Sequence, residues 1–295
     1  MFKQEDVTLC DLVAVITGGG QGIGEGIALN LASFGADIVI ADKNPETAER
    51  TAKKVREIGR KALGLMCDIR NREDVVSVFE RSMAEFGRVD FLVNNAGGVR
   101  HAAFLELGEQ GWQKHLELNI MGVLTPTELA ANAMIKGGRG GSIINISSIE
   151  ASRAAPERSI YGMCKAGMGS LTRSLALELG PHNIRINVIA PDVVATPGLL
   201  LLEEECSGPP ELMRSLQGYV PLGRGGNTDD IGGVCVFLAS PLARYVTGTS
   251  IPVDGGTWAS SGWTKDENGL WESFSGFGAR HKEKIAETAH LRTPS

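Results

Sequence analysis

The stretch TGGGQGIG, residues 17–24, decides the fold of this chain. It follows the apolar run LVAVI, residues 12–16, and precedes an Ala/Leu-rich segment that extends to about Ser33, a pattern that predicts a strand, a tight turn and a helix. Glycines at such a turn let the backbone approach a pyrophosphate, whose charge the free amides and the helix dipole can meet. A plain tight turn is the alternative, but the position between strand and helix favours a nucleotide site.

Strand-like and helix-like segments alternate along the rest of the chain. The helix pattern recurs over residues 46–58, 73–86, around 112–134, and 159–179, and the intervening strands are ADIVIAD, KALGLMCD, VDFLVNNAG, GSIINISS, IRINVIAP and finally GTSIPVDGG. The strands are apolar at nearly every position, which indicates burial on both faces of a parallel sheet. We predict an α/β fold, a Rossmann-type doubly wound sheet of seven parallel strands with helices on both faces, in a single domain over residues 1–256.

Two segments fall outside this alternation. Residues from about 196 to 220 form a predicted lid, and their four successive leucines, residues 199–202, favour an apolar or cyclic substrate; packing of the lid onto the body or onto another subunit is the open alternative. Residues 257–295 form an extension rich in Trp and Phe, which could pack over the mouth of the active site, either its own or that of a neighbouring subunit.

The composition indicates a small-molecule partner. With 29 Lys and Arg against 35 Asp and Glu, the chain carries a net charge of -6, which argues against nucleic-acid binding. The five cysteines are widely spaced without a CxxC pair, so we expect a reduced, cytoplasmic protein without a metal site. No apolar run reaches the roughly 18 residues of a membrane span, and no membrane partner is expected.

Asp42 ends the second predicted strand, some twenty residues beyond the glycine turn, where a carboxylate can accept hydrogen bonds from the adenosine ribose. Its charge would repel a 2'-phosphate, and Gln21 stands where a basic residue could have bound that phosphate. Lys43 opposes this interpretation, since a cation can pair with phosphate. Asp42 and Gln21 together outweigh Lys43, so the sequence predicts NAD as cofactor. The alternative for Asp42 is that it is only a solvated residue at the end of a strand.

Ser148 closes the fifth strand, and Tyr161 and Lys165 lie at positions i and i+4 of the following helix, so their side chains share one helix face. A nearby Lys cation and the positive nicotinamide ring both favour the phenolate, so we expect the pKa of Tyr161 to be lowered toward neutrality. Tyr161 could then accept the proton of an alcohol while the hydride leaves its carbon. Ser148 could orient the substrate oxygen.

Over residues of about 10 to 256 the chain resembles the short-chain dehydrogenase/reductase family. The motifs that carry the resemblance are TGGGQGIG, Asp68, the NNAG run at residues 94–97, Asn119, Ser148, Tyr161 with Lys165, and residues 191–196. Jointly they are specific, although each alone is common.

The resemblance implies roles for individual residues. The implied catalytic residues are Asn119, Ser148, Tyr161 and Lys165. The implied cofactor-binding residues are Gly18, Gln21, Gly22, Ile23, Gly24, Asp42, Asp68, Ile69, Asn95, Ala96, Gly97, Tyr161, Lys165, Pro191, Val194 and Thr196. Within these sets, Lys165 would hold the nicotinamide ribose, Asp68 the adenine amino group and Thr196 the carboxamide. Asn119 would position a water for proton relay, unless it only satisfies backbone groups.

Asp192 departs from the family pattern, because relatives usually carry Gly after the proline. It could contact substrate, pair with a basic neighbour, or cap the turn, and the cap is favoured. The candidate substrate residues are Ser148, Glu150, Tyr161 and Asp192.

Together these inferences predict an NAD(H)-dependent oxidoreductase that interconverts a secondary alcohol and its ketone, with Tyr161 as general acid and base. An NADPH-dependent 3-oxoacyl thioester reductase is the alternative within enzymology, and a noncatalytic dinucleotide sensor or scaffold the alternative outside it. The resemblance suggests a homotetramer or homodimer, formed through the helices after the fourth and fifth strands.

Overall fold

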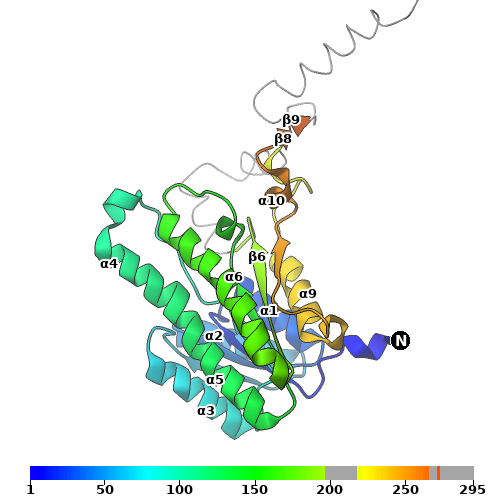
Figure 1. Ribbon diagram of the computed structural model, residues 1–295. Helices are drawn as coiled ribbons and strands as arrows, with labels where there is room; N and C mark the ends of the chain where they lie inside the picture. The colour runs from blue at the N-terminus through cyan, green and yellow to red at the C-terminus, as the bar shows by residue number, and fades with distance from the viewer. Residues whose placement is uncertain (197–217, 266–270, 273–295) are drawn as a thin grey trace, which may run out of the picture.

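A single parallel sheet forms the centre of the molecule (Figure 1). The computed structural model describes residues 1–196, 218–265 and 271–272. The sheet has seven strands in the order β3-β2-β1-β4-β5-β6-β7, all paired in parallel. Their bounds are β1 Val13–Thr17, β2 Asp37–Asp42, β3 Ala62–Met66, β4 Phe91–Asn94, β5 Gly141–Ile146, β6 Ile184–Pro191 and β7 Ser250–Val253. The predicted doubly wound fold is confirmed.

Helices cover both faces of this sheet. The α-helices of the described residues are α1 Gly22–Ser33, α2 Pro45–Glu57, α3 Arg72–Phe86, α4 Phe104–Leu116, α5 Gly122–Gly137, α6 Ser159–Leu179, α9 Thr228–Ala239 and the short α10 Thr257–Ser260. Short 3-10 turns lie at Gln4–Val7, Ile149–Ala151, Gly180–His182 and Pro241–Ala243. An antiparallel pair, β8 Thr264–Lys265 and β9 Trp271–Glu272, belongs to the extension.

Alternation along β1 shows how the sheet divides the core. Ala14 and Ile16 pack with residues of α1, α2 and α9, whereas Val13 and Val15 pack with residues of α3, α5 and α6. All four side chains are at most 2% exposed, because successive residues of a strand point to opposite faces and both faces are covered. The sheet therefore has a core on each side, and its carboxyl edge is left to form a site.

The helices differ from the sequence prediction in two ways. Within the single helix expected around residues 112–134, a π-helical segment, Glu117–Met121, lies between α4 and α5. Upstream of that range, α4 is kinked at Gly108, whose φ is 63°. Helix α9 was not predicted, although Asn227 and Asp230 form a capping box at its start, a signal present in the sequence. α9 packs beside α1, 200 residues away in the chain.

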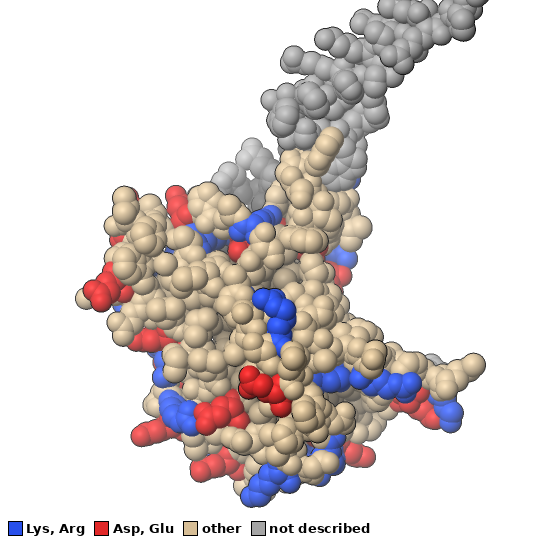
Figure 2. All heavy atoms as spheres, viewed as in Figure 1, with Lys and Arg blue, Asp and Glu red and all other residues tan. Residues whose placement is uncertain are grey.

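The surface carries both signs of charge. On the face shown in Figure 2, Lys and Arg are interspersed with Asp and Glu over the described residues. No helix within the described ranges is long and apolar enough to cross a membrane. Large apolar side chains are exposed on the two helices that follow β4 and β5, among them Leu105 and Leu177, at 91% and 77%.

Candidate active site

The glycine turn between β1 and α1 brings three backbone segments together. Gly18 and Gly22 have φ values of 62° and 58°, which residues with a Cβ rarely adopt. A Cβ at Gly24 would lie 2.2 Å from the carbonyl oxygen of Gly18, so only glycine lets α1 begin this close to the turn. The turn therefore presents the N-terminus of α1 at the carboxyl edge of the sheet.

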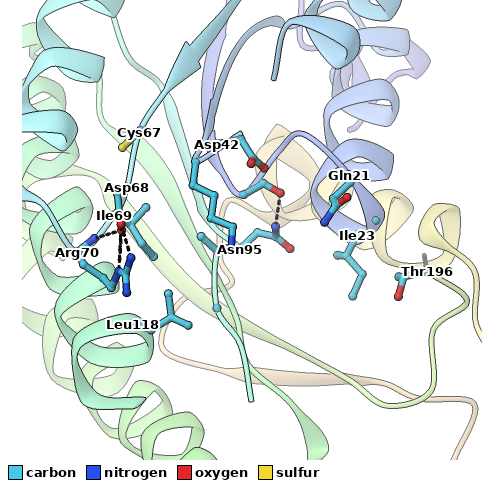
Figure 3. A pocket seen from close by; sticks show the side chains of 15 residues that line it. Gln21, Ile23, Asp42, Cys67, Asp68, Ile69, Arg70, Asn95, Leu118 and Thr196 are labelled. Carbon is cyan, nitrogen blue, oxygen red and sulfur yellow. Dashed lines mark hydrogen bonds and ion pairs between the residues drawn. The ribbon is translucent and has the colours of Figure 1, made fainter. Parts of the chain in front are cut away.

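A cavity of about 450 Å³ lies at this edge, beside the glycine turn. Most of its lining was predicted as cofactor-binding: Gly18, Gln21, Gly22, Ile23, Asp42, Asp68, Ile69, Asn95, Ala96, Gly97 and Thr196. Figure 3 shows Asp68, Ile69 and Arg70 on one side of it and Gln21, Ile23 and Thr196 on the other. A cavity of this size, walled by a glycine turn and the first turn of a helix, fits a dinucleotide.

Asp42 is fixed beneath the glycine turn. Its carboxylate accepts hydrogen bonds from the amides of Gly20, at 3.0 Å, and Asn44, also at 3.0 Å, and its side chain is nearly buried. Both contacts come from backbone amides, so the negative charge has a defined position at the pocket wall.

Asn95 ties the end of β4 to the turn after β1. Its Nδ2 donates to the carbonyl oxygens of Thr17 and Gly18 at 3.1 and 2.9 Å, while the Thr17 hydroxyl accepts from the amides of Asn95 and Ala96, each at 3.1 Å. These contacts hold the two neighbouring strand ends together, so the Asn95 side chain shapes the middle of the cavity.

Four cavity residues were not predicted: Lys43, Cys67, Arg70 and Leu118. In the sequence, Lys43 is only a cation that opposes the choice of NAD. Arg70 donates from Nε to both carboxylate oxygens of Asp68, at 2.9 and 3.1 Å, and this contact holds the pKa of Asp68 below its usual value. Arg70 lies two residues from Asp68 and could have been considered from the sequence, since a cation so placed can reach the carboxylate.

A second, smaller cavity of about 200 Å³ continues from the first, with which it shares Ile23, Asn95 and Gly97. Its other lining residues include Ser148, Tyr161, Lys165, Pro191 and Asp192. Residues from β5, α6 and the end of β6, far apart in the chain, therefore meet in one place next to the dinucleotide-sized cavity.

Lys165 is buried beside Tyr161. Its Nζ donates to the carbonyl oxygen of Ile146 at 2.9 Å and lies 5.5 Å from the centre of the Tyr161 ring. Burial lowers the pKa of Lys165 to about 8. Its position is further held by the Ser147 hydroxyl, which donates to the Lys165 carbonyl oxygen at 3.0 Å.

The expected lowering of the Tyr161 pKa is not found in the protein alone. Burial raises the pKa of Tyr161, and the hydrogen bond with Ser148 opposes this only in part. Hence the phenol is protonated at neutral pH in this structure. The Lys165 charge is visible in the sequence, whereas the removal of the phenol from water depends on how the elements pack.

Asn119 lies in the π-helical segment between α4 and α5, and such segments are frequent at functional sites. Its Oδ1 accepts from the amide of Gly98 at 3.2 Å, and its Nδ2 donates to the carbonyl oxygens of Gly98 and His115 at 3.0 and 3.1 Å. A Cβ on Gly97 would lie 3.0 Å from Asn119 Oδ1 and 3.3 Å from Lys165 Nζ. Asn119 thus satisfies backbone groups and also reaches the neighbourhood of Lys165.

Asp192 pairs with a basic neighbour, one of the three possibilities for this departure from the family pattern. Arg153 donates to Asp192 Oδ1 at 3.2 Å and to Glu150 Oε1 at 3.0 Å. Arg153 also donates to the hydroxyl of Tyr219. Neither Arg153 nor Tyr219 was predicted, and no short-range pattern marks them, because they lie 39 and 27 positions from Asp192 in opposite directions.

Two predicted cofactor residues do not line these cavities. Gly24 lies behind the glycine turn, where its role is close packing. Val194 is buried in the core and forms a parallel bridge with Gly226. Among the described residues, no group of three or more His, Cys, Asp and Glu is arranged to hold a metal ion.

The model of a family described as enoyl-(acyl carrier protein) reductase matches residues 18–257. The chain belongs to the short-chain dehydrogenase/reductase family. It is therefore an oxidoreductase that, like its relatives, is of the alcohol dehydrogenase and ketone reductase kind.

Relatives in this family differ in their named substrates. The chain is 38% identical over 244 residues to a 2-dehydro-3-deoxy-D-gluconate 5-dehydrogenase of Escherichia coli, covering 83% of this chain and 94% of that protein. It is 34% identical to a 3-oxoacyl-[acyl-carrier-protein] reductase of Thermotoga maritima, covering 83% and 96%. A solved 7α-hydroxysteroid dehydrogenase, in complex with NADH and 7-oxo glycochenodeoxycholic acid, aligns with a TM-score of 0.81 at 33% identity, covering 87% of this chain and 98% of that one.

Proposed function

We propose that this protein is an NAD(H)-dependent oxidoreductase that interconverts a secondary alcohol and its ketone. The observation that carries the proposal is that Ser148, Tyr161 and Lys165 line one cavity, which continues into the dinucleotide-sized cavity beside Asp42. A noncatalytic sensor has no need of a proton-transfer group at the junction of the two cavities.

Each side chain has a defined part in the reaction. In the reduction, Tyr161 Oη gives its proton to the ketone oxygen as the carbon receives a hydride, which leaves an alcohol and a phenolate; oxidation runs the same steps in reverse, from the phenolate. A nicotinamide cofactor held in the cavity beside the glycine turn would accept the hydride in the oxidation and supply it in the reduction. Ser148 orients the substrate oxygen through its hydroxyl.

Lys165 and Asn119 support the proton transfer. The Lys165 ammonium lies 5.5 Å from the centre of the Tyr161 ring, and its pKa of about 8 lets it exchange a proton near neutral pH. Asn119 holds a water that passes this proton toward solvent, a role that its approach to Gly97 and Lys165 supports.

Asp42 favours NAD over NADP. Its carboxylate, fixed by two amides at the wall of the cavity, accepts from the ribose hydroxyls and repels a 2'-phosphate. The NADH in the structure of the hydroxysteroid dehydrogenase supports this choice. Lys43 and Arg70 line the same cavity, but Arg70 is already paired with Asp68.

Other parts of the proposal rest on the sequence. The leucines that favour an apolar or cyclic substrate, and most of the lid of about residues 196–220, lie outside the described residues, as does most of the extension after residue 265. We further propose assembly as a homotetramer or homodimer through the helices after β4 and β5. The exposed apolar side chains on those helices support this surface.

A spectrophotometric assay tests the function. The purified protein is given NAD+ or NADP+ with a panel of cyclic alcohols and steroids, and formation of the reduced cofactor is followed. We expect turnover with NAD+ and a secondary alcohol, abolished in Tyr161→Phe, while NAD+ binding stays nearly intact. Substantial turnover by Tyr161→Phe would refute the assignment of the base, and activity restricted to NADPH and 3-oxoacyl thioesters would favour the alternative reductase.

A further inference from the structure

Two carboxylates are buried around one guanidinium on the substrate side of the catalytic pocket. The side chains of Glu150 and Asp192 are 6% and 9% exposed, and Arg153 lies between them. Arg153 donates to one oxygen of each, at 3.0 and 3.2 Å, and Arg158 donates to the same oxygen of Glu150 at 3.2 Å. Two negative charges are thus balanced by two positive ones.

The second oxygen of each carboxylate has no hydrogen-bond donor within the described part of the chain. Glu150 Oε2 and Asp192 Oδ2 are buried and have no hydrogen-bond partner among the described residues. A buried acceptor without a donor costs roughly 1 to 3 kcal/mol, and more when it is charged, so such an atom is a natural place for a ligand's donor.

Two hydroxyl groups, those of Thr257 and Tyr219, lie near Asp192 and help to lower its pKa, yet within the described part of the chain neither makes a hydrogen bond to Oδ2. The Thr257 hydroxyl, which lies close enough to influence the pKa of Asp192, donates to Asp254, at 3.2 Å from either its carbonyl or its carboxylate oxygen. The Arg153 guanidinium is shared by Glu150, Asp192 and Tyr219. Burial accordingly raises the pKa of Asp192, opposed only in part by these neighbours.

The two carboxylates face different spaces. Asp192 lines the cavity of about 200 Å³ that also contains Ser148 and Tyr161, whereas Glu150 lines a different hollow together with Arg153, Pro156 and Met163. Of the two carboxylate residues, Asp192 is therefore the one that lines the cavity of the catalytic tyrosine.

We propose that Asp192 selects substrates that carry a second hydroxyl near the reacting carbon, which donates a hydrogen bond to Asp192 Oδ2. The substrate class is then a diol or polyol, or the matching hydroxyketone, rather than a plain apolar alcohol. Glu150 and Arg153 are positioning residues that hold the Asp192 carboxylate. An anionic substrate group beside Asp192 is disfavoured, because the Arg153 guanidinium is already paired with the carboxylates of Glu150 and Asp192.

This proposal deepens the proposed function and rests on it for the identity of the pocket, but a binding measurement tests it without turnover. The enzyme saturated with NADH is titrated calorimetrically with trans-cyclohexane-1,2-diol and with cyclohexanol. Both ligands and the cofactor are in the reduced state, so no hydride is transferred. The quantity compared is the ratio of the two dissociation constants in each variant.

We expect the wild type to favour the diol about tenfold or more, as a hydrogen bond to a charged group would give. Asp192→Ala should bring the ratio close to one, and Asp192→Asn, whose amide oxygen still accepts, should fall between the two. Glu85→Gln, which removes a charge from the exposed surface of α3, is the control and should keep the wild-type ratio.

Three results would overturn the proposal: a wild type that binds the diol no better than the mono-ol, a preference that survives in Asp192→Ala, or an Asp192→Ala variant that weakens NADH binding with the ratio unchanged. The last would assign Asp192 to the cofactor. Failure of the proposed function reads differently: a preference that depends on Asp192, together with no NAD+ reduction by any alcohol, would refute the dehydrogenase and leave the hydroxyl site standing.

Discussion

The Nζ of Lys165 donates to the carbonyl oxygen of Ile146 at 2.9 Å while it lies 5.5 Å from the centre of the Tyr161 ring. The carbonyl belongs to the last residue of β5, and Lys165 lies on α6, so this contact fixes the ammonium at the junction of strand and helix. The Lys side chain is held in a buried position by the fold itself, before any ligand binds.

The first prediction concerns the pH dependence of stability. Burial lowers the pKa of Lys165 from 10.5 to about 8, so between these values the unfolded chain binds a proton here that the folded chain does not. Relative to Lys165→Met, the free energy of unfolding of the wild type should rise as pH increases through this window, by on the order of 3 kcal/mol. Urea unfolding on both sides of the window measures it. Lys53→Met, at an exposed site on α2, is the control. The prediction would be wrong if the difference in free energy of unfolding between the wild type and Lys165→Met did not vary with pH.

The second prediction concerns cofactor choice. Asp42→Ala removes both the acceptor for the ribose hydroxyls and the charge that repels a 2'-phosphate. Steady-state kinetics should show kcat/KM for NAD+ lowered about tenfold or more, which corresponds to the loss of one hydrogen bond to a charged group. The ratio of kcat/KM for NAD+ to kcat/KM for NADP+ should fall by a larger factor. In Lys43→Ala the ratio should move in the opposite direction, because a cation that could accept the phosphate is lost. An Asp42→Ala enzyme with the wild-type ratio would remove Asp42 from the site.

The third prediction concerns the close approach at the glycine turn. In Gly24→Ala the new Cβ would meet the Gly18 carbonyl oxygen at 2.2 Å and Asn95 Nδ2 at 2.5 Å, so α1 must shift away from the turn. Thermal or urea unfolding should show a loss of about 1 to 3 kcal/mol, and NAD+ affinity should fall with it.

Gly233→Ala is the matched control for that substitution. Gly233 lies inside α9, where a Cβ would meet nothing within 4 Å. Alanine has the higher helix propensity, so this variant should gain up to about 1 kcal/mol. Equal effects of the two substitutions would show that crowding at the turn is not what demands glycine at position 24.

The fourth prediction concerns the extension. Lys265 in β8 donates from Nζ to the carbonyl oxygen of Pro221 at 3.2 Å, which joins the extension to the chain that follows the proposed lid. Removing residues 257–295 should therefore raise KM for the alcohol more than KM for NAD+. Lys265→Met should reproduce part of the change. A truncated enzyme with unchanged kinetics and unchanged assembly, measured by light scattering, would exclude a role for the extension at the active site.

Local patterns were sufficient for the fold and for much of the site. Helix periodicity over residues 159–179 predicted α6 with its observed bounds, and a spacing of four residues placed Tyr161 and Lys165 on one helix face. The glycine turn and Asp42 were visible because a strand, a turn and a helix follow one another directly. Helix α9 was not predicted, because its start is marked by a capping box and not by a strong apolar pattern. The π-helical segment between α4 and α5 was not predicted either, because it changes the apolar pattern very little.

What the sequence by itself determined was the α/β fold, which follows from the alternation of strand and helix patterns. It also pointed to the residues proposed for proton transfer, through the spacing of Tyr161 and Lys165 and the resemblance to the family. Tertiary structure alone decided the surroundings of those residues. It raised rather than lowered the pKa of Tyr161 by burying the phenol, and it gave Asp192 a partner, Arg153, from 39 positions away. Burial and long-range ion pairs depend on which elements pack together, and no local pattern records that.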